Sequence, residues 1–276
     1  MFRVILKEEL TKGIIRIVVE AKQIAEKARA GQFVAVIVDE NGERIPLTLA
    51  DWDKDKGTIT LIFQQVGFTT SKLGKLESGG FLQHILGPLG HPTQIQNFGT
   101  VICIGGGVGI AEVFPVSRAF KQAGNRVLGI IGARSRNLLI LENEMQKICA
   151  ELFITTDDGS YGRKGFVTEP LKELLDVMER STHTKYPELV YCIGPVGMMK
   201  AVSRLTKDYN IKTIASINPI MVDATGMCGS CRCKVAGKTV FGCVDGPDFD
   251  AHQIDFDELQ ARLDLFKGQE NVANER

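Results

Sequence analysis

Four of the chain's seven cysteines lie within MVDATGMCGSCRCKVAGKTVFGC, the segment from Met221 to Cys243. In a reducing compartment, thiols this dense are more typical of a metal site or a reactive centre than of disulfides. Cys228 and Cys231 form a C-x2-C pair, Cys233 adds a further thiol, and Cys243 follows a predicted glycine-containing hairpin. The segment therefore predicts a metal site that is built largely from thiolates.

The spacing leaves two sets of ligands open. A plant-type [2Fe–2S] cluster uses C-x4-C-x2-C and a distant fourth cysteine. Both gaps are present here, but Asp223 occupies the first position, so one set is Asp223, Cys228, Cys231 and Cys243. The competing set replaces Asp223 by Cys233 and would form a tetrahedral zinc site. Because residues two apart in an extended segment share a face, geometry does not exclude Cys233, and the spacing favours the cluster over zinc.

A second group of residues suited to chemistry is a glycine-rich turn. Gly105, Gly106, Gly107 and Gly109 follow an apolar strand and open an amphipathic helix. Glycines there let backbone N–H groups approach a pyrophosphate, and the helix N-terminus favours the negative charge. The pattern G-x-G-x-x-G is incomplete because Ile110 stands at its last position. Nucleotide binding is therefore predicted, with a tight structural turn as the alternative.

Two further loops follow predicted strands, CIGPVGMM at 192–199 and DDGSYGRKG at 157–165. Ligands of parallel sheets bind beyond the carboxyl ends of the strands, so we expect both loops at the same edge as the glycine turn. The second loop offers hydroxyls and backbone to a ribose or nicotinamide, and a mobile polar loop is its alternative. The residues expected at this site, beside the four glycines, are Asp157, Gly159, Gly194, Pro195 and Met198.

Two kinds of domain must position these motifs. Residues 1–98 contain short apolar or alternating runs between turn signals, which predicts a small antiparallel barrel or sandwich. Residues 99–220 alternate strand and helix about four times, which predicts a parallel, doubly wound sheet. The Cys-rich segment 221–250 leaves that pattern. Residues 251–276 are predicted to form a loop, one amphipathic helix and a loose polar tail.

Composition excludes some classes of partner. The 276 residues include 33 Lys+Arg and 33 Asp+Glu, and the pI is about 6.9. This balance favours neither nucleic acid nor a membrane surface. The N-terminal apolar run is too short for a signal peptide, and no apolar run reaches the about 18 residues of a membrane helix. We expect a soluble cytoplasmic protein without nucleic-acid or membrane partners.

The predicted barrel carries residues that could bind a cofactor. An arginine and several threonines can cradle phosphates, but they are equally ordinary on the solvent face of a barrel. The candidates in a predicted strand and in the turn after a second strand are Arg44, Pro46, Leu47, Thr48, Gly67, Thr69 and Thr70.

A barrel, a nucleotide-binding sheet and a C-terminal cysteine cluster together resemble the ferredoxin-NADP reductase superfamily. More narrowly, the chain resembles the electron-transfer subunits of dihydroorotate dehydrogenase and, most closely, the small (alpha) subunits of NADH-dependent ferredoxin:NADP oxidoreductase. The resemblance covers nearly the whole chain. Its motifs are RIPLT (44–48), GFTT (67–70), GPLG (87–90), GGGVGIAEVFP (105–115), DDGSYGRKGFVT (157–168), GPVGMM (194–199) and MVDATGMCGSC with FGCVDGPDFD (221–250).

The resemblance implies an FAD-binding β-barrel domain, with the isoalloxazine near residues 44–48 and the diphosphate near residues 67–70. The superfamily's usual R-x-[FY]-[ST] would place arginine at position 45, where this chain has Ile45. Its nucleotide loop is G-G-x-G-[IV]-A, which accommodates Ile110. In the most similar family the resemblance also implies ligation by Asp223 and three cysteines, whereas the dihydroorotate subunits resemble all-cysteine versions.

The function implied is an electron-transfer flavoprotein subunit with FAD, NAD(H) and a [2Fe–2S] cluster. Electrons would pass to or from a larger flavin and iron–sulfur subunit in a heterodimer, which handles NADP(H) and ferredoxin by electron bifurcation. No acid–base residue is required. Arg134 and Arg136 follow the second sheet strand, where a 2′-phosphate could be met, so NAD over NADP rests on the resemblance. The alternatives are a dihydroorotate dehydrogenase electron-transfer subunit and a zinc-bearing nucleotide-binding regulatory module.

Overall fold

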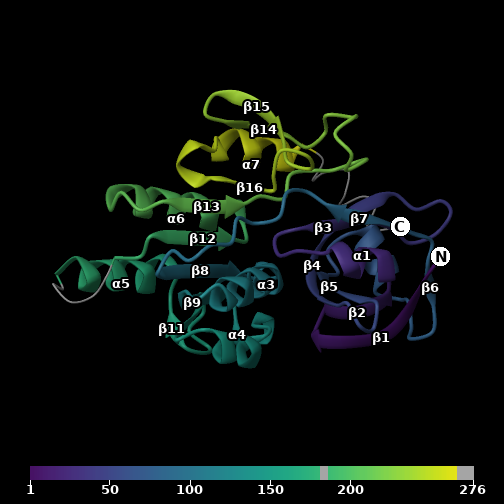
Figure 1. Ribbon diagram of the computed structural model, residues 1–276, viewed down its shortest axis with the longest axis horizontal. Helices are drawn as coiled ribbons and strands as arrows, with labels where there is room; N and C mark the ends of the chain where they lie inside the picture. The colour runs from purple at the N-terminus through teal and green to yellow at the C-terminus, as the bar shows by residue number, and fades with distance from the viewer. Residues whose placement is uncertain (181–185, 266–276) are drawn as a thin grey trace. The chain divides into compact units, whose positions relative to one another are not determined.

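The computed structural model describes residues 1–180 and 186–265, which form two compact units (Figure 1). The first unit comprises Met1–Pro92, Asn218–Pro247 and the segment from Asp255 onward, and the second comprises Thr93–Ile217 and Asp248–Ile254. The Cys-rich segment thus belongs to the same unit as the N-terminal strands. None of the described helices carries an apolar stretch long enough to cross a membrane.

The sheet of the first unit is an antiparallel barrel, as predicted. Its strands follow the order β6-β1-β2-β5-β4-β3-β7, and every pairing is antiparallel. The first and last strands of that order are separated in the chain by Gln83 alone, so the sheet curls until it nearly closes. The elements are β1 (Phe2–Thr11), β2 (Ile14–Glu20), α1 (Lys22–Lys27), β3 (Phe33–Ile37), β4 (Arg44–Asp53), β5 (Thr58–Gln64), α2 (Phe68–Leu73), β6 (Phe81–Leu82) and β7 (His84–Leu89).

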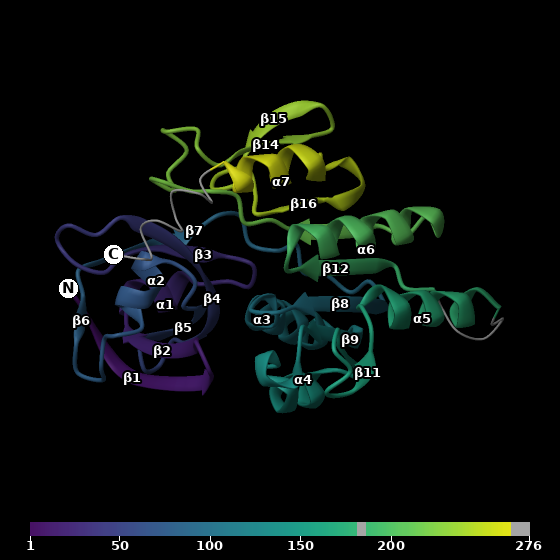
Figure 2. The ribbon, with the colours of Figure 1, turned by 180° about the vertical axis from the view of Figure 1, so that it is seen from behind.

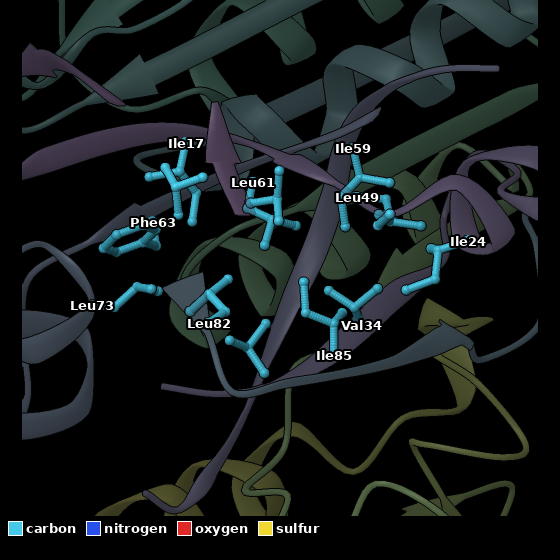
Figure 3. Packing of buried hydrophobic residues seen from close by; sticks show 14 of the residues in the cluster. Ile17, Ile24, Val34, Leu49, Ile59, Leu61, Phe63, Leu73, Leu82 and Ile85 are labelled. Atoms are coloured by element: carbon cyan, nitrogen blue, oxygen red, sulfur yellow. The ribbon is translucent and has the colours of Figure 1, made fainter. Parts of the chain in front are cut away.

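Alternation along these strands builds the barrel core. Successive side chains of a strand point to opposite faces, so every second apolar residue can enter the interior. Figure 3 shows side chains from several strands pointing toward one another, and all of them are buried. Burial of each such side chain stabilises the fold by about 1.5–3 kcal/mol. Labelled examples are Ile17, Leu49, Leu61, Phe63 and Leu82.

The second unit contains the predicted parallel sheet, in the order β11-β10-β9-β8-β12-β13-β16. All neighbours are parallel except β16, which runs antiparallel to β13. Helix α3 packs against β8, β9 and β12, and α6 packs against β12 and β13 (Figure 2). The strands are β8 (Thr100–Gly106), β9 (Arg126–Ala133), β10 (Glu151–Thr156), β11 (Arg163–Lys164), β12 (Leu189–Ile193), β13 (Thr213–Ser216) and β16 (Asp248–Asp250).

The helices between these strands match the predicted alternation. The helix before β10 is short, because a 3-10 turn and an extended stretch precede α4. The helices are α3 (Gly109–Gln122), η1 (Arg136–Leu138), α4 (Glu142–Ile148), α5 (Thr168–Arg180), α6 (Val196–Asp208) and η2 (Ala251–Gln253).

The Cys-rich segment contains the predicted hairpin, formed by β14 (Arg232–Val235) and β15 (Lys238–Phe241). Its two-residue turn has positive φ at both Ala236 and Gly237, as a type I′ turn requires. Helix α7 (Phe256–Asp264) follows and packs against β14. The polar tail predicted after this helix lies outside the described residues.

Candidate functional site

The loop before the first cysteine is organised by the carboxylate of Asp223. The amide of Thr225 donates to Asp223 Oδ1 at 2.8 Å, and the amide of Cys228 donates to Oδ2 at 2.9 Å. These backbone bonds, that of Thr225 first, lower the pKa of Asp223. The loop is thereby folded so that the carboxylate lies beside Cys228. Each carboxylate oxygen has two acceptor sites, so both amide bonds leave sites free for a metal.

The next two cysteines meet across the base of the hairpin. Cys231 Sγ and Cys243 Sγ are 3.2 Å apart and both residues are buried. The amide of Gly242 donates to the carbonyl of Cys231 at 3.0 Å, which holds the two ends of the hairpin together. Burial, together with the neighbouring Cys231 thiol, raises the pKa of Cys243. A bound cation would offset that effect, because metals bind the thiolate.

Cys228 has a different environment because it is exposed. Its Sγ lies 3.2 Å from the hydroxyl of Ser230, and the Ser230 amide donates to the same sulfur at 3.5 Å. These two contacts lower the pKa of the Cys228 thiol. The loop therefore favours a thiolate at this position.

Cys233 makes its contact with the paired strand of the hairpin. It is buried on β14, and its Sγ lies 3.9 Å from the Val240 carbonyl on the paired strand. Burial raises the pKa of Cys233 to about 12. Among the described residues no hydrogen bond links Cys233 to Cys228, Cys231 or Cys243.

The candidate ligands lie in two neighbouring parts of the Cys-rich segment. Over residues 1–180 and 186–265, no group of three or more His, Cys, Asp or Glu side chains is arranged to hold a metal ion. The Asp223 carboxylate instead accepts from the amide of Cys228, and Cys231 Sγ lies beside Cys243 Sγ. A [2Fe–2S] cluster takes two protein ligands per iron, so these pairs would hold one iron each.

Residues 221–231, here called the cluster loop, pack on the barrel within the first unit. Met221, Ala224, Cys231 and Cys243 are buried in one apolar cluster with Phe33 and Ala35 of β3. Leu89 and Phe241 pack against the same cluster. The sulfur-bearing side of the loop is therefore built over a barrel strand.

Three arginines donate to backbone carbonyls of this loop. Arg44 Nη1 on β4 donates to the Asp223 carbonyl at 3.1 Å, and Arg232 Nη1 donates to the Gly229 carbonyl at 3.1 Å. Arg262 Nη2 on α7 donates to the Ser230 carbonyl at 2.9 Å. Arg44, expected beside an isoalloxazine, is thus directed to the cluster loop.

Some of the other barrel candidates have surface that a ligand could contact, whereas others already form hydrogen bonds within the protein. Pro46, Leu47 and Thr48 lie on β4 opposite β3 and are only half-buried, which leaves apolar and hydroxyl surface that fits a flavin. Thr69 is buried and donates its hydroxyl to Glu43. Thr70 serves the helix α2 itself, because its hydroxyl accepts from the amide of Gly67 at 3.0 Å. Near Gly67 an added Cβ would meet only Thr70 Oγ1, at 4.0 Å, so the backbone there is open to a ligand.

The two glycine loops of the sheet lie together, as their place on one sheet edge predicts. An added Cβ at Gly106 would lie 2.4 Å from Met198 Sδ, and one at Gly194 would lie 3.1 Å from the Cα of Gly106. An added Cβ at Gly109 would lie 2.7 Å from the Ile193 carbonyl oxygen. Gly107 has a positive φ of 57° and open space around it. This edge fits a pyrophosphate at the start of α3.

The loop after β10 is folded by its own polar groups. Thr156 Oγ1 donates to the Tyr161 carbonyl at 2.6 Å, and the Arg136 amide donates to Ser160 Oγ at 2.8 Å. The Arg136 guanidinium lies 4.6 Å from the centre of the Tyr161 ring, whose hydroxyl donates to Glu142 at 2.7 Å. Asp157 and Gly159 are within this fold, because their amides donate to the carbonyls of Ala133 and Thr156.

Two family models match the chain. Residues 103–204 match the oxidoreductase NAD-binding domain, and residues 218–255 match the iron–sulfur cluster binding domain of dihydroorotate dehydrogenase B. The second range contains Asp223 and all four cysteines of the Cys-rich segment. These matches replace the zinc alternative with an iron–sulfur site.

Relatives match along the whole chain. A protein of Thermotoga maritima described as a dihydroorotate dehydrogenase B (NAD(+)) electron transfer subunit homolog is 38% identical over 273 residues, which are 99% of this chain and 94% of that protein. The chain belongs to this family of electron-transfer subunits and their homologues. An uncharacterized protein in the adh 3′ region of Clostridium beijerinckii is 42% identical over 283 residues, covering 99% of this chain and 93% of that protein.

A solved structure agrees with this family. The chain matches one reported for insights into flavin-based electron bifurcation in the NADH-dependent reduced ferredoxin-NADP oxidoreductase, with 38% identity and a TM-score of 0.91. The match covers 100% of this chain and 97% of that one. As in the family, the chain is an oxidoreductase subunit for electron transfer that uses FAD, NAD(H) and a [2Fe–2S] cluster.

Several residues that shape the site could not be assigned from the sequence. Ser230 lies inside the C-x2-C pair, and a hydroxyl there is a usable signal for a sulfur contact. Arg232 lies one residue beyond the pair. Glu43 and Arg262 carry no such signal, because their contacts join residues far apart in the chain.

Proposed function

We propose that this chain is the small subunit of an NADH-dependent reduced ferredoxin:NADP oxidoreductase. It would exchange electrons with a larger flavin and iron–sulfur subunit in a heterodimer, and with ferredoxin through that subunit. The observation that carries this proposal is the carboxylate of Asp223, which lies beside Cys228 at the position where the resemblance implies cysteine in the dihydroorotate subunits.

When bound, FAD would supply hydride exchange with NAD(H) and one-electron exchange with the cluster, and the cluster would supply one-electron transfer to a partner. The chain's own residues bind and orient these groups. Asp223 and Cys228 would hold one iron, and Cys231 and Cys243 the other. A carboxylate is a harder donor than a thiolate, so Asp223 alters the potential of the cluster.

The sheet unit and the barrel would bind the organic cofactors. The backbone at Gly107 and the start of α3 would receive the pyrophosphate of NAD(H), with Gly194, Pro195 and Met198 beside it. Half-buried Pro46, Leu47 and Thr48 would contact the flavin. No described residue needs to move a proton, since hydride and electron transfer require none of the protein's acids or bases.

A second candidate function is electron transfer for dihydroorotate oxidation. It is favoured by the match of residues 218–255 to the iron–sulfur domain of dihydroorotate dehydrogenase B. The position of Asp223 opposes it. The two functions differ in partner and in substrate, which makes them separable.

The ligand set is tested by the spectrum of the anaerobically purified chain. We expect flavin bands, broad iron–sulfur absorption and two irons per chain. D223A should lose or destabilise the cluster, D223C should keep it with an altered electron paramagnetic resonance signal, and C233S should keep the signal of the unsubstituted chain. Cluster loss in C233S with D223A unaffected would show that Cys233, and not Asp223, is the ligand. A colourless chain with one bound zinc would overturn the proposal.

The partner is tested by purifying the chain from its native source with whatever it binds. We expect a larger subunit with flavin and iron–sulfur centres, and a complex that couples NADPH oxidation to the reduction of ferredoxin and NAD⁺. A complex that reduces NAD⁺ with dihydroorotate, and not with NADPH and ferredoxin, would establish the second candidate instead.

A further inference from the structure

The cluster loop is surrounded by guanidinium groups from three different elements. Arg44 comes from β4, Arg232 from the start of β14 and Arg262 from α7, and each donates to a different loop carbonyl. Arg44 and Asp223 are 179 positions apart in the chain. The convergence of three cations on one short loop is therefore a property of the fold.

These bonds orient the amides of the loop. The C=O and N–H of a trans peptide point in opposite directions, so a carbonyl held on one side directs the next amide to the other. The Gly229 carbonyl binds Arg232, and the following amide, that of Ser230, donates to Cys228 Sγ. By the same geometry Arg44 turns the Ala224 amide, and Arg262 the Cys231 amide, away from the guanidinium. Amides that donate hydrogen bonds to the sulfurs of an iron–sulfur cluster raise the reduction potential of that cluster.

The three arginines differ in how their charge is compensated. Arg262 lies 3.9 Å from the Glu258 carboxylate, one turn away on α7. Arg44 forms no ion pair with any carboxylate in the part of the chain that the structure describes. Its hydrogen bond to the Asp223 backbone places its charge beside the first ligand position.

We propose that Arg44 is a positioning residue of the cluster that raises the reduction potential of the carboxylate-ligated [2Fe–2S] centre, and that it does not bind the flavin. The inference rests on the proposed function, because it takes Asp223 as a ligand. Reduction moves one electron from the reduced flavin to the cluster. The added negative charge is stabilised by a nearby cation, since opposite charges attract.

The experiment compares three variants of the full holo chain. R44Q removes the charge and keeps a donor, R44K keeps the charge, and R3Q removes an exposed arginine of β1 as a matched control. The cluster potential is measured by titration with electron paramagnetic resonance, and the flavin potential by absorbance. R44Q should lower the equilibrium constant for cluster reduction about tenfold, which is about 59 mV for one electron. R44K and R3Q should stay near the unsubstituted chain.

A second measurement keeps the test decisive if R44Q fails to retain the cluster. Arg44 is exposed, so salt should screen it, and the cluster potential of the unsubstituted chain should fall as ionic strength rises. In R44K the same salt dependence should remain. An absence of salt dependence would overturn the proposal.

The outcomes separate this inference from the proposed function. A cluster whose potential is unchanged in R44Q, or an R44K variant that behaves as R44Q does, overturns the role of Arg44 alone. Loss of flavin, or a shift of the flavin potential, in R44Q would return Arg44 to the flavin site. An unsubstituted chain without any [2Fe–2S] signal would instead overturn the proposed function.

Discussion

The two ligand-binding regions of the chain are built on opposite principles. The nucleotide edge of the sheet depends on the absence of side chains, because its glycines let the backbone of β8, β12 and α3 approach closely. The cluster loop is held by side-chain hydrogen bonds, because arginines of β4, β14 and α7 donate to its backbone carbonyls. The first region therefore depends on space and the second on hydrogen bonds and charge.

The glycines themselves show the difference. Gly109 faces the Ile193 carbonyl oxygen, so an added Cβ at 2.7 Å would meet backbone that cannot move aside. Gly229 in the cluster loop has a positive φ of 68°, but an added Cβ would meet only the Phe241 ring, at 3.6 Å. Glycine is thus needed for close backbone packing at Gly109 and for a positive φ at Gly229.

The largest effect is expected for G109A. Its Cβ would force β12 and α3 apart, and we expect a loss of about 3 kcal/mol in the free energy of unfolding together with loss of NADH binding. Urea unfolding and NADH titration measure the two effects. G197A is the matched control for stability alone, since Gly197 lies in the first turn of α6 with open space around it and alanine should leave the unfolding curve near that of the unsubstituted chain. Equal unfolding curves for the two variants would contradict the packing role of Gly109.

The next effect concerns conformation in the cluster loop. G229A should cost about 1–2 kcal/mol, because an ordinary residue disfavours the left-handed region. G229N should recover part of that loss, since asparagine tolerates positive φ. Chemical denaturation of the apo chain measures both variants. If G229N loses as much stability as G229A, then steric room and not the positive φ decides which residues position 229 tolerates. The contrast with Gly109 would then be wrong.

A pH-dependent effect is expected in the sheet unit at Asp248. Asp248 is half-buried, and its carboxylate accepts from Thr93 Oγ1 at 2.6 Å and from the Tyr191 hydroxyl at 3.0 Å. Burial raises the pKa of Asp248 above its ordinary value of 3.8, although the surrounding hydroxyls oppose this. Above pH 3.8 the unfolded chain then binds fewer protons than the native one, so the free energy of unfolding falls as pH rises through the folded pKa.

D248N should remove this dependence. We expect urea unfolding of the sheet unit, followed by amide exchange of β12 and β13, to vary less in the variant than in the unsubstituted chain as pH rises above 3.8. Y191F is the control, because it keeps the carboxylate and should keep the direction of the pH dependence. An unchanged slope in D248N would assign the dependence to other groups.

The contrast between the regions also explains what the sequence could predict. The strands of the barrel and the glycine turn at Gly105–Gly109 follow from local patterns of apolar residues and glycine, and both were predicted. Strand β16 was not, because its residues Asp248–Asp250 are short and polar and gain their place by pairing with β13. The contact of Arg44 with the Asp223 carbonyl was also missed, since no local pattern links positions so far apart. Spacing alone identified Asp223 as a candidate ligand, which remains a prediction.

The smallest effect is expected for S230A, within the cluster loop. The hydroxyl of Ser230 accepts from the Val222 amide at 3.0 Å and lies 3.2 Å from Cys228 Sγ. Its loss should cost about 0.5–1.5 kcal/mol, because the amide it binds is exposed and can turn to water. The cluster should load normally, with a lower potential, since one hydrogen bond to a ligand sulfur is gone. S78A, which removes a hydroxyl that binds the Lys7 amide at 3.1 Å in the barrel, should leave the potential unchanged. Equal potentials in the two variants would mean that the loop holds Cys228 through backbone bonds alone, so that the cluster region would resemble the nucleotide edge after all.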